Sequence, residues 1–152
     1  MRCLALFLAL AVCCAAAGKP GLSGTWTLAA ARSDFAKQPA PKSKIVRIEH
    51  REPSLVISIE EEDARGAVKG TAHYTTGGRE CVNDIFGNPM KAVAVWEGET
   101  LYMRTWGSFA GNEIKLDDRY TLSKYGKTLT LRRHFEGQRG GVEDQILVHE
   151  KQ

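Results

Sequence analysis

The side chains of this sequence that could carry chemistry are few, and their spacing fits no catalytic or metal-binding motif. The four histidines lie in four separate segments of the chain: His50, His73, His134 and His149. No two of them have the close spacing of metal ligands, so we predict no metal site and no haem or other cofactor. The sequence has no Gly-x-Ser-x-Gly nucleophile motif and no glycine-rich loop leading into a helix, and nothing else in it identifies an enzyme. Cys81 has no histidine near it in the sequence, so we expect a half-buried strand residue rather than a reactive thiol.

Asp118, Tyr120 and Arg133 are the polar residues whose positions suggest a shared role. Side chains alternate between the two faces of a strand, and this alternation places all three on the apolar face of their segments. If Leu122 pairs with Lys127 in the intervening hairpin, Asp118 and Arg133 are diagonal neighbours on that face. Because an unpaired buried charge is costly, we expect Arg133 to pair with Asp118. The alternative is that Asp118 points elsewhere and Arg133 binds a ligand carboxylate.

The elements that would position these residues are predicted to be strands almost throughout. Runs of Val, Ile, Thr and aromatic residues alternate with charged residues, and Gly, Asn, Asp or Pro separates the runs. A helical pattern is confined to residues 28–35, before the proline-rich loop 38–42. The sequence therefore predicts an all-β fold, a single antiparallel up-and-down β-barrel of about 8–10 strands with little helix. The predicted strands are Gly24–Ala29, Ile45–Arg51, Ser54–Glu61, Ala67–Thr75, Glu80–Asp84, Met90–Glu97, Thr100–Trp106, Asn112–Leu122, Lys127–Phe135 and Val142–Glu150.

The inward faces of these strands carry both large and small side chains. Small residues such as Ala72 and Ala94 leave room inside, whereas Trp26 and Tyr120 fill it, so we expect a modest, partly occluded cavity. Alternation places only one of the histidines, His50, on an inward face. The inward residues that we expect to contact a ligand are Val46, Ile48, His50, Ile57, Tyr74, Trp96, Met103, Tyr120, Arg133 and Phe135.

Residues 1–17 have the features of a secretory signal peptide. A basic residue is followed by an unbroken apolar run, and Ala15–Ala17 supplies the small residues that signal peptidase needs. The run is shorter than the roughly 18–20 residues of a membrane-spanning helix. We therefore expect an exported protein, periplasmic or secreted, in which residues 18–152 form one domain; lipid attachment at a cysteine of the signal is the alternative. Only Cys81 remains after cleavage, so no intramolecular disulfide can form.

The distribution of charged and apolar residues indicates which kinds of partner the protein can bind. The formal net charge is +3 and the basic residues are scattered, so we do not expect nucleic-acid binding. No second apolar segment is long enough to cross a membrane. The segment Met90–Trp96 is apolar on both faces, which is expected where a loop, a helix or another chain covers the outside of a barrel. A homodimer is therefore an alternative to a monomer.

Several segments resemble known β-barrel proteins. Residues 22–26, LSGTW, are similar to the Gly-x-Trp signature that opens the first strand of lipocalins. Residues 23–35, 74–83 and 117–137 resemble segments of uncharacterised, exported lipocalin-like proteins of bacterial envelopes. Together with the signal, this resemblance extends over essentially the whole chain. It implies a lipocalin-like, calycin-type barrel and no particular activity.

The resemblance also assigns roles at the closed end of the barrel. In lipocalins the Trp of the signature plugs this end, and an Arg from a late strand packs across the indole. The residues that we assign to this plug are Gly24, Trp26, Arg133 and its partner Asp118. The sequence lacks the Thr-Asp-Tyr motif of lipocalins and has no room for their final helix, so a ten-stranded barrel of the fatty-acid-binding type is an alternative. The Arg-x-Tyr pair that binds a carboxylate in that second family is absent, because Arg119 and Tyr120 are adjacent.

Three functions are compatible with these features. The prediction is that the barrel binds a small hydrophobic or amphipathic molecule in its interior. One alternative is a structural or interaction protein of the cell envelope, with a barrel filled by its own side chains. The other is an isomerase or hydrolase that uses Asp118, Tyr120 or His50 as its acid or base.

Overall fold

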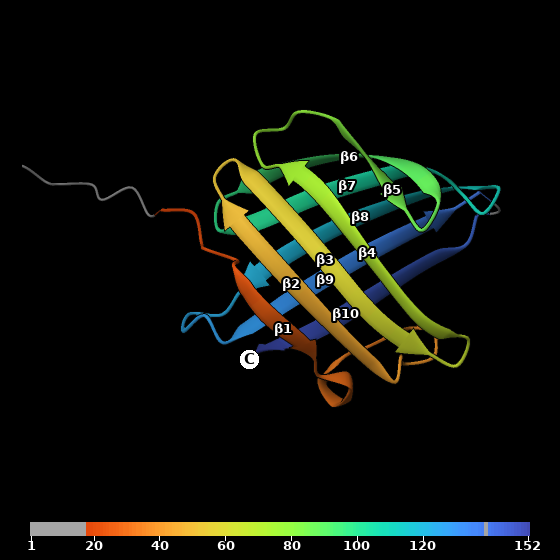
Figure 1. The fold of residues 1–152 in the computed structure, drawn as a ribbon, viewed down its shortest axis with the longest axis horizontal. Coiled ribbons are helices and arrows are strands. Elements are labelled where there is room, and N and C mark those ends of the chain that lie inside the picture. Colours follow the sequence, from red (N-terminus) through yellow and green to blue (C-terminus); the bar gives the residue numbers. More distant parts are fainter. Residues whose placement is uncertain (1–17, 139) are drawn as a thin grey trace, which may run out of the picture.

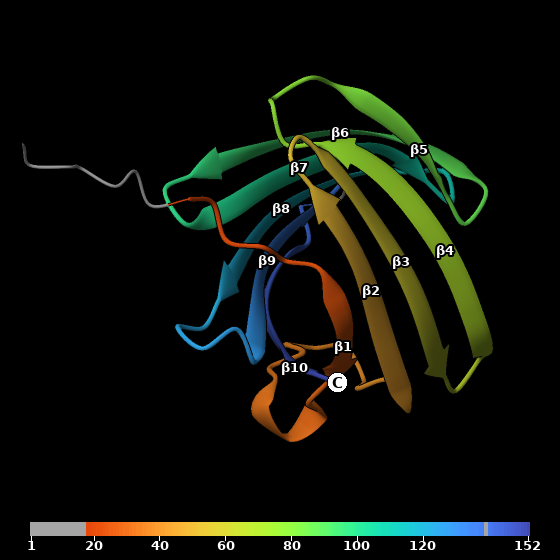
Figure 2. The same ribbon diagram turned by 60° about the vertical axis from the view of Figure 1, so that its left-hand side comes forward.

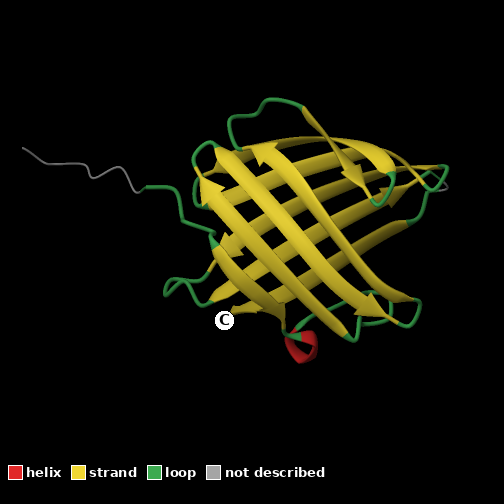
Figure 3. Ribbon diagram, in the orientation of Figure 1, coloured by secondary structure: helices red, strands yellow, loops and turns green. Residues whose placement is uncertain are grey.

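The computed structural model describes residues 18–138 and 140–152, and it confirms the predicted all-β fold (Figure 3). The predicted signal peptide lies outside the described residues. One short 3-10 turn, η1 (Ala30–Arg32), is the only helical element in the described part of the chain, which therefore holds no helix able to span a membrane. The ten strands are β1 (Gly24–Leu28), β2 (Ser43–Arg51), β3 (Ser54–Asp63), β4 (Gly66–Thr75), β5 (Cys81–Ile85), β6 (Asn88–Glu97), β7 (Thr100–Phe109), β8 (Asn112–Leu122), β9 (Thr128–Gly137) and β10 (Val142–Lys151). Their ends differ from the predicted ones by at most three residues.

The strands form one antiparallel sheet that curls into a barrel. Its order is β4-β3-β2-β1-β10-β9-β8-β7-β6-β5, so strands that are consecutive in sequence pair with each other except β4 and β5, and β1 also pairs with β10. Figures 1 and 2 show β2, β3 and β4 crossing over β7 to β10, which gives the barrel a front and a back wall. This up-and-down order is the one that the sequential hairpins predicted.

The two edge strands, β4 and β5, complete the barrel without a backbone ladder. The Asn83 side chain on β5 takes the place of a strand partner: its Oδ1 accepts from the His73 amide at 2.7 Å, and its Nδ2 donates to the His73 carbonyl at 3.0 Å. Further along, the Phe86 ring lies over Gly70 of β4, where a Cβ would come within 3.1 Å of it. One amide side chain and one aromatic ring therefore bridge the seam between β4 and β5.

The hairpin between β8 and β9 has a different register from the one that we considered. Leu122 pairs with Leu129 rather than with Lys127, so Asp118 lies directly opposite Arg133 instead of diagonally. The turn is longer because the Ser123 hydroxyl accepts hydrogen bonds from the Lys127 and Thr128 amides. The two polar residues still meet on the inner face, since a shift of two residues keeps every side chain on its face.

The outer face of β6 is covered, in part, by the protein's own chain. Gly77, in the loop between β4 and β5, forms an isolated bridge with Val95, and the Gly78 amide donates to the Ala94 carbonyl at 3.0 Å. A Cβ at Gly78 would lie 3.1 Å from the Val95 side chain. This loop accounts for part of the apolar outer face that we considered as a contact with a second chain.

The closed end of the barrel is packed around Trp26, which is fully buried. Its indole Nε1 donates to the Leu22 carbonyl at 3.0 Å, and Leu22 itself is 1% exposed. The cation over the indole is Lys151 of β10, whose Nζ lies 5.2 Å from the ring centroid. The structure thus places Lys151 where we expected Arg133, and Arg133 and Asp118 lie further along the interior. Gly24 is required here, since it has a φ of +151° and a Cβ would come within 2.6 Å of Lys151 Cε.

Candidate functional site

The open half of the barrel contains a cavity of about 390 Å³. One wall comes from β3 and β4, and the other comes from β5 to β9 and the turn that contains Phe86. Most of its surface is apolar. The side chains that define this interior cavity include Ile57, Ile59, Val68, Ala72, Tyr74, Phe86, Met90, Met103, Phe109, Leu116, Asp118, Tyr120, Arg133 and Phe135.

An ion pair between Asp118 and Arg133 forms the polar part of the wall. Arg133 Nε donates to Asp118 Oδ1 at 2.8 Å, and Arg133 Nη2 donates to Oδ2 at 2.7 Å. The Asp118 side chain is 4% exposed and that of Arg133 is 26% exposed. Burial alone would lower the pKa of Arg133, but the Asp118 carboxylate outweighs this effect and raises that pKa. The guanidinium is therefore charged, and Asp118 engages its side-on edge through Nε and Nη2.

Two tyrosines, Tyr74 of β4 and Tyr120 of β8, line the cavity near this ion pair. Burial is the main cause of a rise in the pKa of Tyr74 to about 12, and the Asp118 carboxylate adds to it. Burial also raises the pKa of Tyr120, again with Asp118 as a second cause. Both phenols are therefore neutral at physiological pH. Within the described residues, neither hydroxyl makes a side-chain hydrogen bond to the protein, so both are open to a ligand.

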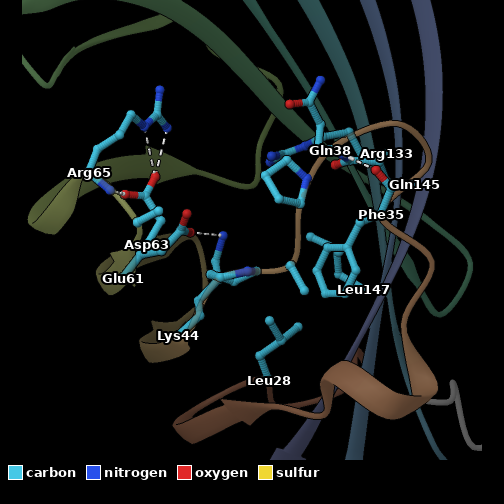
Figure 4. A pocket seen from close by; sticks show the side chains of 14 residues that line it. Leu28, Phe35, Gln38, Lys44, Glu61, Asp63, Arg65, Arg133, Gln145 and Leu147 are labelled. Atoms are coloured by element: carbon cyan, nitrogen blue, oxygen red, sulfur yellow. Dashed lines mark hydrogen bonds and ion pairs between the residues drawn. The ribbon is translucent and has the colours of Figure 1, made fainter.

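A second hollow, which we call the vestibule, adjoins the cavity at the open end of the barrel and has a volume of about 560 Å³ (Figure 4). Residues of β2, β3 and the turn after β3 lie on one side of it, and Phe35, Gln145 and Leu147 lie on the other. Three residues line both hollows: Lys44, Glu61 and Arg133. The vestibule and the interior cavity therefore meet at these charged side chains.

The charged residues of the vestibule are paired with one another. Lys44 Nζ lies 2.7 Å from Glu61 Oε2, with side chains that are 14% and 29% exposed. Arg65 and Asp63 form a second pair at 2.7 Å, which is more exposed. Figure 4 shows both pairs on the same side of the hollow. The route to the cavity thus passes a partly buried ion pair rather than a free charge.

Six of the ten residues predicted to contact a ligand line the interior cavity. They are Ile57, Tyr74, Met103, Tyr120, Arg133 and Phe135. The other four lie towards the closed end. Val46 and Ile48 are 6% and 3% exposed, belong to the core cluster that contains Trp26 and do not line the cavity.

His50 and Trp96 belong to a hydrogen-bond network around Glu52, not to the cavity. Trp96 Nε1 donates to Glu52 Oε1 at 2.5 Å, and His50 Nε2 donates to the same oxygen at 2.8 Å. The Thr76 hydroxyl donates to Oε2 at 2.7 Å. Burial alone would raise the pKa of Glu52, but these hydrogen bonds outweigh it and lower that pKa to about 2. The structure places His50 and Trp96 in this network at the closed end, outside the lining of the interior cavity.

Sequence reasoning did not identify three residues of the interior. His149 is 3% exposed and shares the inward face of β10 with Leu147, so His50 is not the only inward histidine, as we had expected. Lys44 and Glu61 were not singled out, although opposite charges on adjacent antiparallel strands are a signal that could have indicated their pairing.

Among the described residues, the three that we considered as an acid or base do not all lie together. Asp118 and Tyr120 lie in the cavity wall, whereas His50 is engaged by Glu52 at the closed end. Across residues 18–138 and 140–152, no group of three or more metal-ligating side chains comes together. The arrangement can enclose a small molecule and offer it hydroxyl hydrogen bonds.

Solved structures of similar fold are barrels of the same kind. Two variants of the fluorescent protein UnaG match with TM-scores of 0.60 and 0.56 at 14% and 15% sequence identity; they cover 86% and 85% of this chain, and 95% and 94% of theirs is covered. Secretory abundant heat soluble protein 4 from Ramazzottius varieornatus matches with a TM-score of 0.51 at 16% identity, over 89% of this chain and 96% of that one. These matches show a calycin-like fold. No protein-family model matches the sequence, and no curated protein is similar to it.

Proposed function

We propose that this protein binds a small, mainly apolar molecule inside the barrel. The observation that carries the proposal is the interior cavity of about 390 Å³, walled by apolar side chains with a few convergent polar groups. Small-molecule sites have this composition and volumes of roughly 300–1,000 Å³. The similarity to UnaG supports the barrel fold that encloses the cavity, and it does not identify a ligand.

The alternative of a barrel filled by its own side chains fits the structure less well. The closed half does meet that description, because Trp26, Leu55 and Leu101 are fully buried there. The open half does not, since a small residue, Ala72, lines a space that the opposite wall does not occupy. A hollow confined to one half, with an approach from the vestibule, favours a binding site.

Filling the cavity tests this proposal. Ala72 is 6% exposed and lines the cavity, so Ala72→Phe places a ring in the space that a ligand would occupy. Ala67 is exposed on the same strand, and Ala67→Phe is the matched control. We expect N-phenyl-1-naphthylamine, a neutral fluorescent probe, to bind the wild type and the control with similar affinity and the Ala72 variant at least about tenfold more weakly. Absence of probe binding to the wild type, or equal binding to all three proteins, would contradict the proposal.

We also propose that the protein is exported and acts outside the cytoplasm. The basis is the order of charge, apolar run and small residues in residues 1–17. The mature protein would then begin at Gly18 and keep one cysteine. Intact-mass measurement of protein recovered from the periplasm or medium tests the cleavage site and would also detect a lipid or a dimer. A cytoplasmic protein that retains residues 1–17 would refute export.

A further inference from the structure

The charges that face the interior cavity nearly balance, with one more carboxylate than there are cations. Two cationic side chains line it, Lys44 and Arg133, and three carboxylates do so, Glu61, Asp84 and Asp118. Both cations have a carboxylate partner at 2.7 Å. No cation among the described residues of the lining is therefore free to neutralise an anionic ligand.

Geometry makes the Arg133 guanidinium hard to recruit. Asp118 accepts two hydrogen bonds from Nε and Nη2 in a side-on arrangement, so one of the two edges through which a guanidinium binds a carboxylate bidentately is already occupied. An anion entering beside Arg133 would also come close to the Asp118 carboxylate, which is 4% exposed and weakly screened by water. The desolvation of a ligand carboxylate would then have no free cation to compensate it at this wall.

The groups that remain available for polar contacts are neutral hydroxyls. Tyr74 and Tyr120 face the cavity from opposite walls, on β4 and β8. A phenol can donate to a carbonyl or hydroxyl oxygen and can also accept from a hydroxyl. Two such groups on opposite walls suit a ligand with an uncharged oxygen function on an apolar frame.

We propose that the ligand is uncharged, an apolar molecule with a carbonyl, ester or hydroxyl group, and that the Asp118–Arg133 pair excludes carboxylates such as free fatty acids. This inference rests on the proposed function and specifies the ligand class for the same cavity. The ion pair acts as a selectivity element, and Tyr74 and Tyr120 hold the polar group of the ligand.

A matched pair of probes tests the charge preference. cis-Parinaric acid and its methyl ester share one fluorescent apolar chain and differ in charge at mildly alkaline pH. We expect the purified protein to bind the ester about tenfold or more tightly than the acid. Tighter binding of the acid would overturn the inference and leave the proposed function standing. Failure of both probes, together with failure of the neutral naphthylamine, would overturn the proposed function itself.

Variants of the ion pair test the cause of the preference. Asp118→Asn removes the carboxylate and leaves Arg133 free, so the acid should gain at least about tenfold in affinity and should raise the melting temperature of this variant. The double variant Asp118→Leu, Arg133→Leu removes both charges, and it should still prefer the ester. If Asp118→Asn alone does not fold, the double variant still tests whether the preference depends on a free cation. Unchanged selectivity in Asp118→Asn, or preference for the acid in the double variant, would overturn the inference.

The hydroxyls are tested separately. Tyr74→Phe and Tyr120→Phe should each weaken ester binding roughly 2- to 10-fold, the effect of losing one hydrogen bond, while the apolar wall is kept. Tyr125 is 81% exposed in the turn between β8 and β9, and Tyr125→Phe is the control. Equal ester affinity in all three variants would overturn the role of the hydroxyls.

Discussion

His149 should make the stability of this protein fall as the pH drops from 6.5 towards 4. It lies on β10 between Leu28 of β1 and Leu129 of β9 and is 3% exposed. Neither ring nitrogen has a hydrogen-bond partner within the described residues. Burial lowers the pKa of His149 from 6.5 to about 4, and the positive charge of Lys44 adds to this effect.

The sign and size of the effect follow from proton linkage. Between pH 6.5 and pH 4 the unfolded chain holds a proton on this imidazole and the folded chain does not, so acidification favours unfolding. The stability that depends on the neutral ring is present in full above pH 6.5 and is lost as the pH falls. A pKa difference of this size corresponds to roughly 2 kcal/mol between pH 7 and pH 4.5, at about 1.4 kcal/mol for each pH unit. The interval ends at pH 4.5 because folding lowers the pKa of Glu52 from 4.5 to about 2, so below pH 4.5 this carboxylate protonates in the unfolded chain and also reduces stability.

Urea unfolding at a series of pH values measures this effect. The variant His149→Leu removes the ring and keeps an apolar side chain of similar size, so its free energy of unfolding should match or exceed that of the wild type at pH 7. The gap between the two proteins should widen by roughly 2 kcal/mol at pH 4.5. His73 is exposed on β4, and His73→Gln is the control that should follow the wild type. A constant gap between His149→Leu and wild type from pH 7 to pH 4.5 would refute the reasoning.

Two further predictions concern the backbone of the barrel. Gly24→Ala should lower the free energy of unfolding in urea by about 1–3 kcal/mol because of its positive φ, and by more if the Lys151 side chain cannot move aside; Gly66→Ala, at a φ of +130° with open space around it, isolates the backbone part. Asn83→Ala should open the seam between β4 and β5 and speed hydrogen exchange at the His73 amide, whereas unchanged exchange would show that Asn83 does not hold the seam.

The fold could be predicted from the sequence because it depends on local patterns. Alternation along each segment, with turn residues between segments, indicated ten strands in hairpin order, and the structure has ten. The register between β8 and β9 could not be predicted in this way. It depends on the Ser123 hydroxyl, which accepts two backbone amides and lengthens the turn. Alternation still placed Asp118 and Arg133 together, because it depends on parity alone.

The site was predicted less completely because its location depends on three-dimensional shape. Alternation identifies inward residues but not their depth along the barrel. It therefore grouped Val46 and Ile48, which pack against the plug, with Tyr74 and Phe135, which line the cavity. The cation over Trp26 is another such case, since Lys151 reaches the indole only because β10 pairs with β1. Pairings between the two ends of a chain leave no local signal.

The division of the interior into a filled and a hollow half is itself an argument for binding. Interiors are close-packed when nothing but stability is at stake, and the closed half shows that this sequence can achieve such packing around Trp26. In the open half the same strands carry an ion pair and two tyrosine hydroxyls with no hydrogen-bond partner among the described side chains. Packed apolar residues of equal volume would give the barrel the same stability or more, because replacing a buried ion pair with such residues is often neutral or stabilising. The open half therefore contains polar groups and empty space that stability does not require, and it adjoins the vestibule. A barrel needs these features to select and hold a molecule.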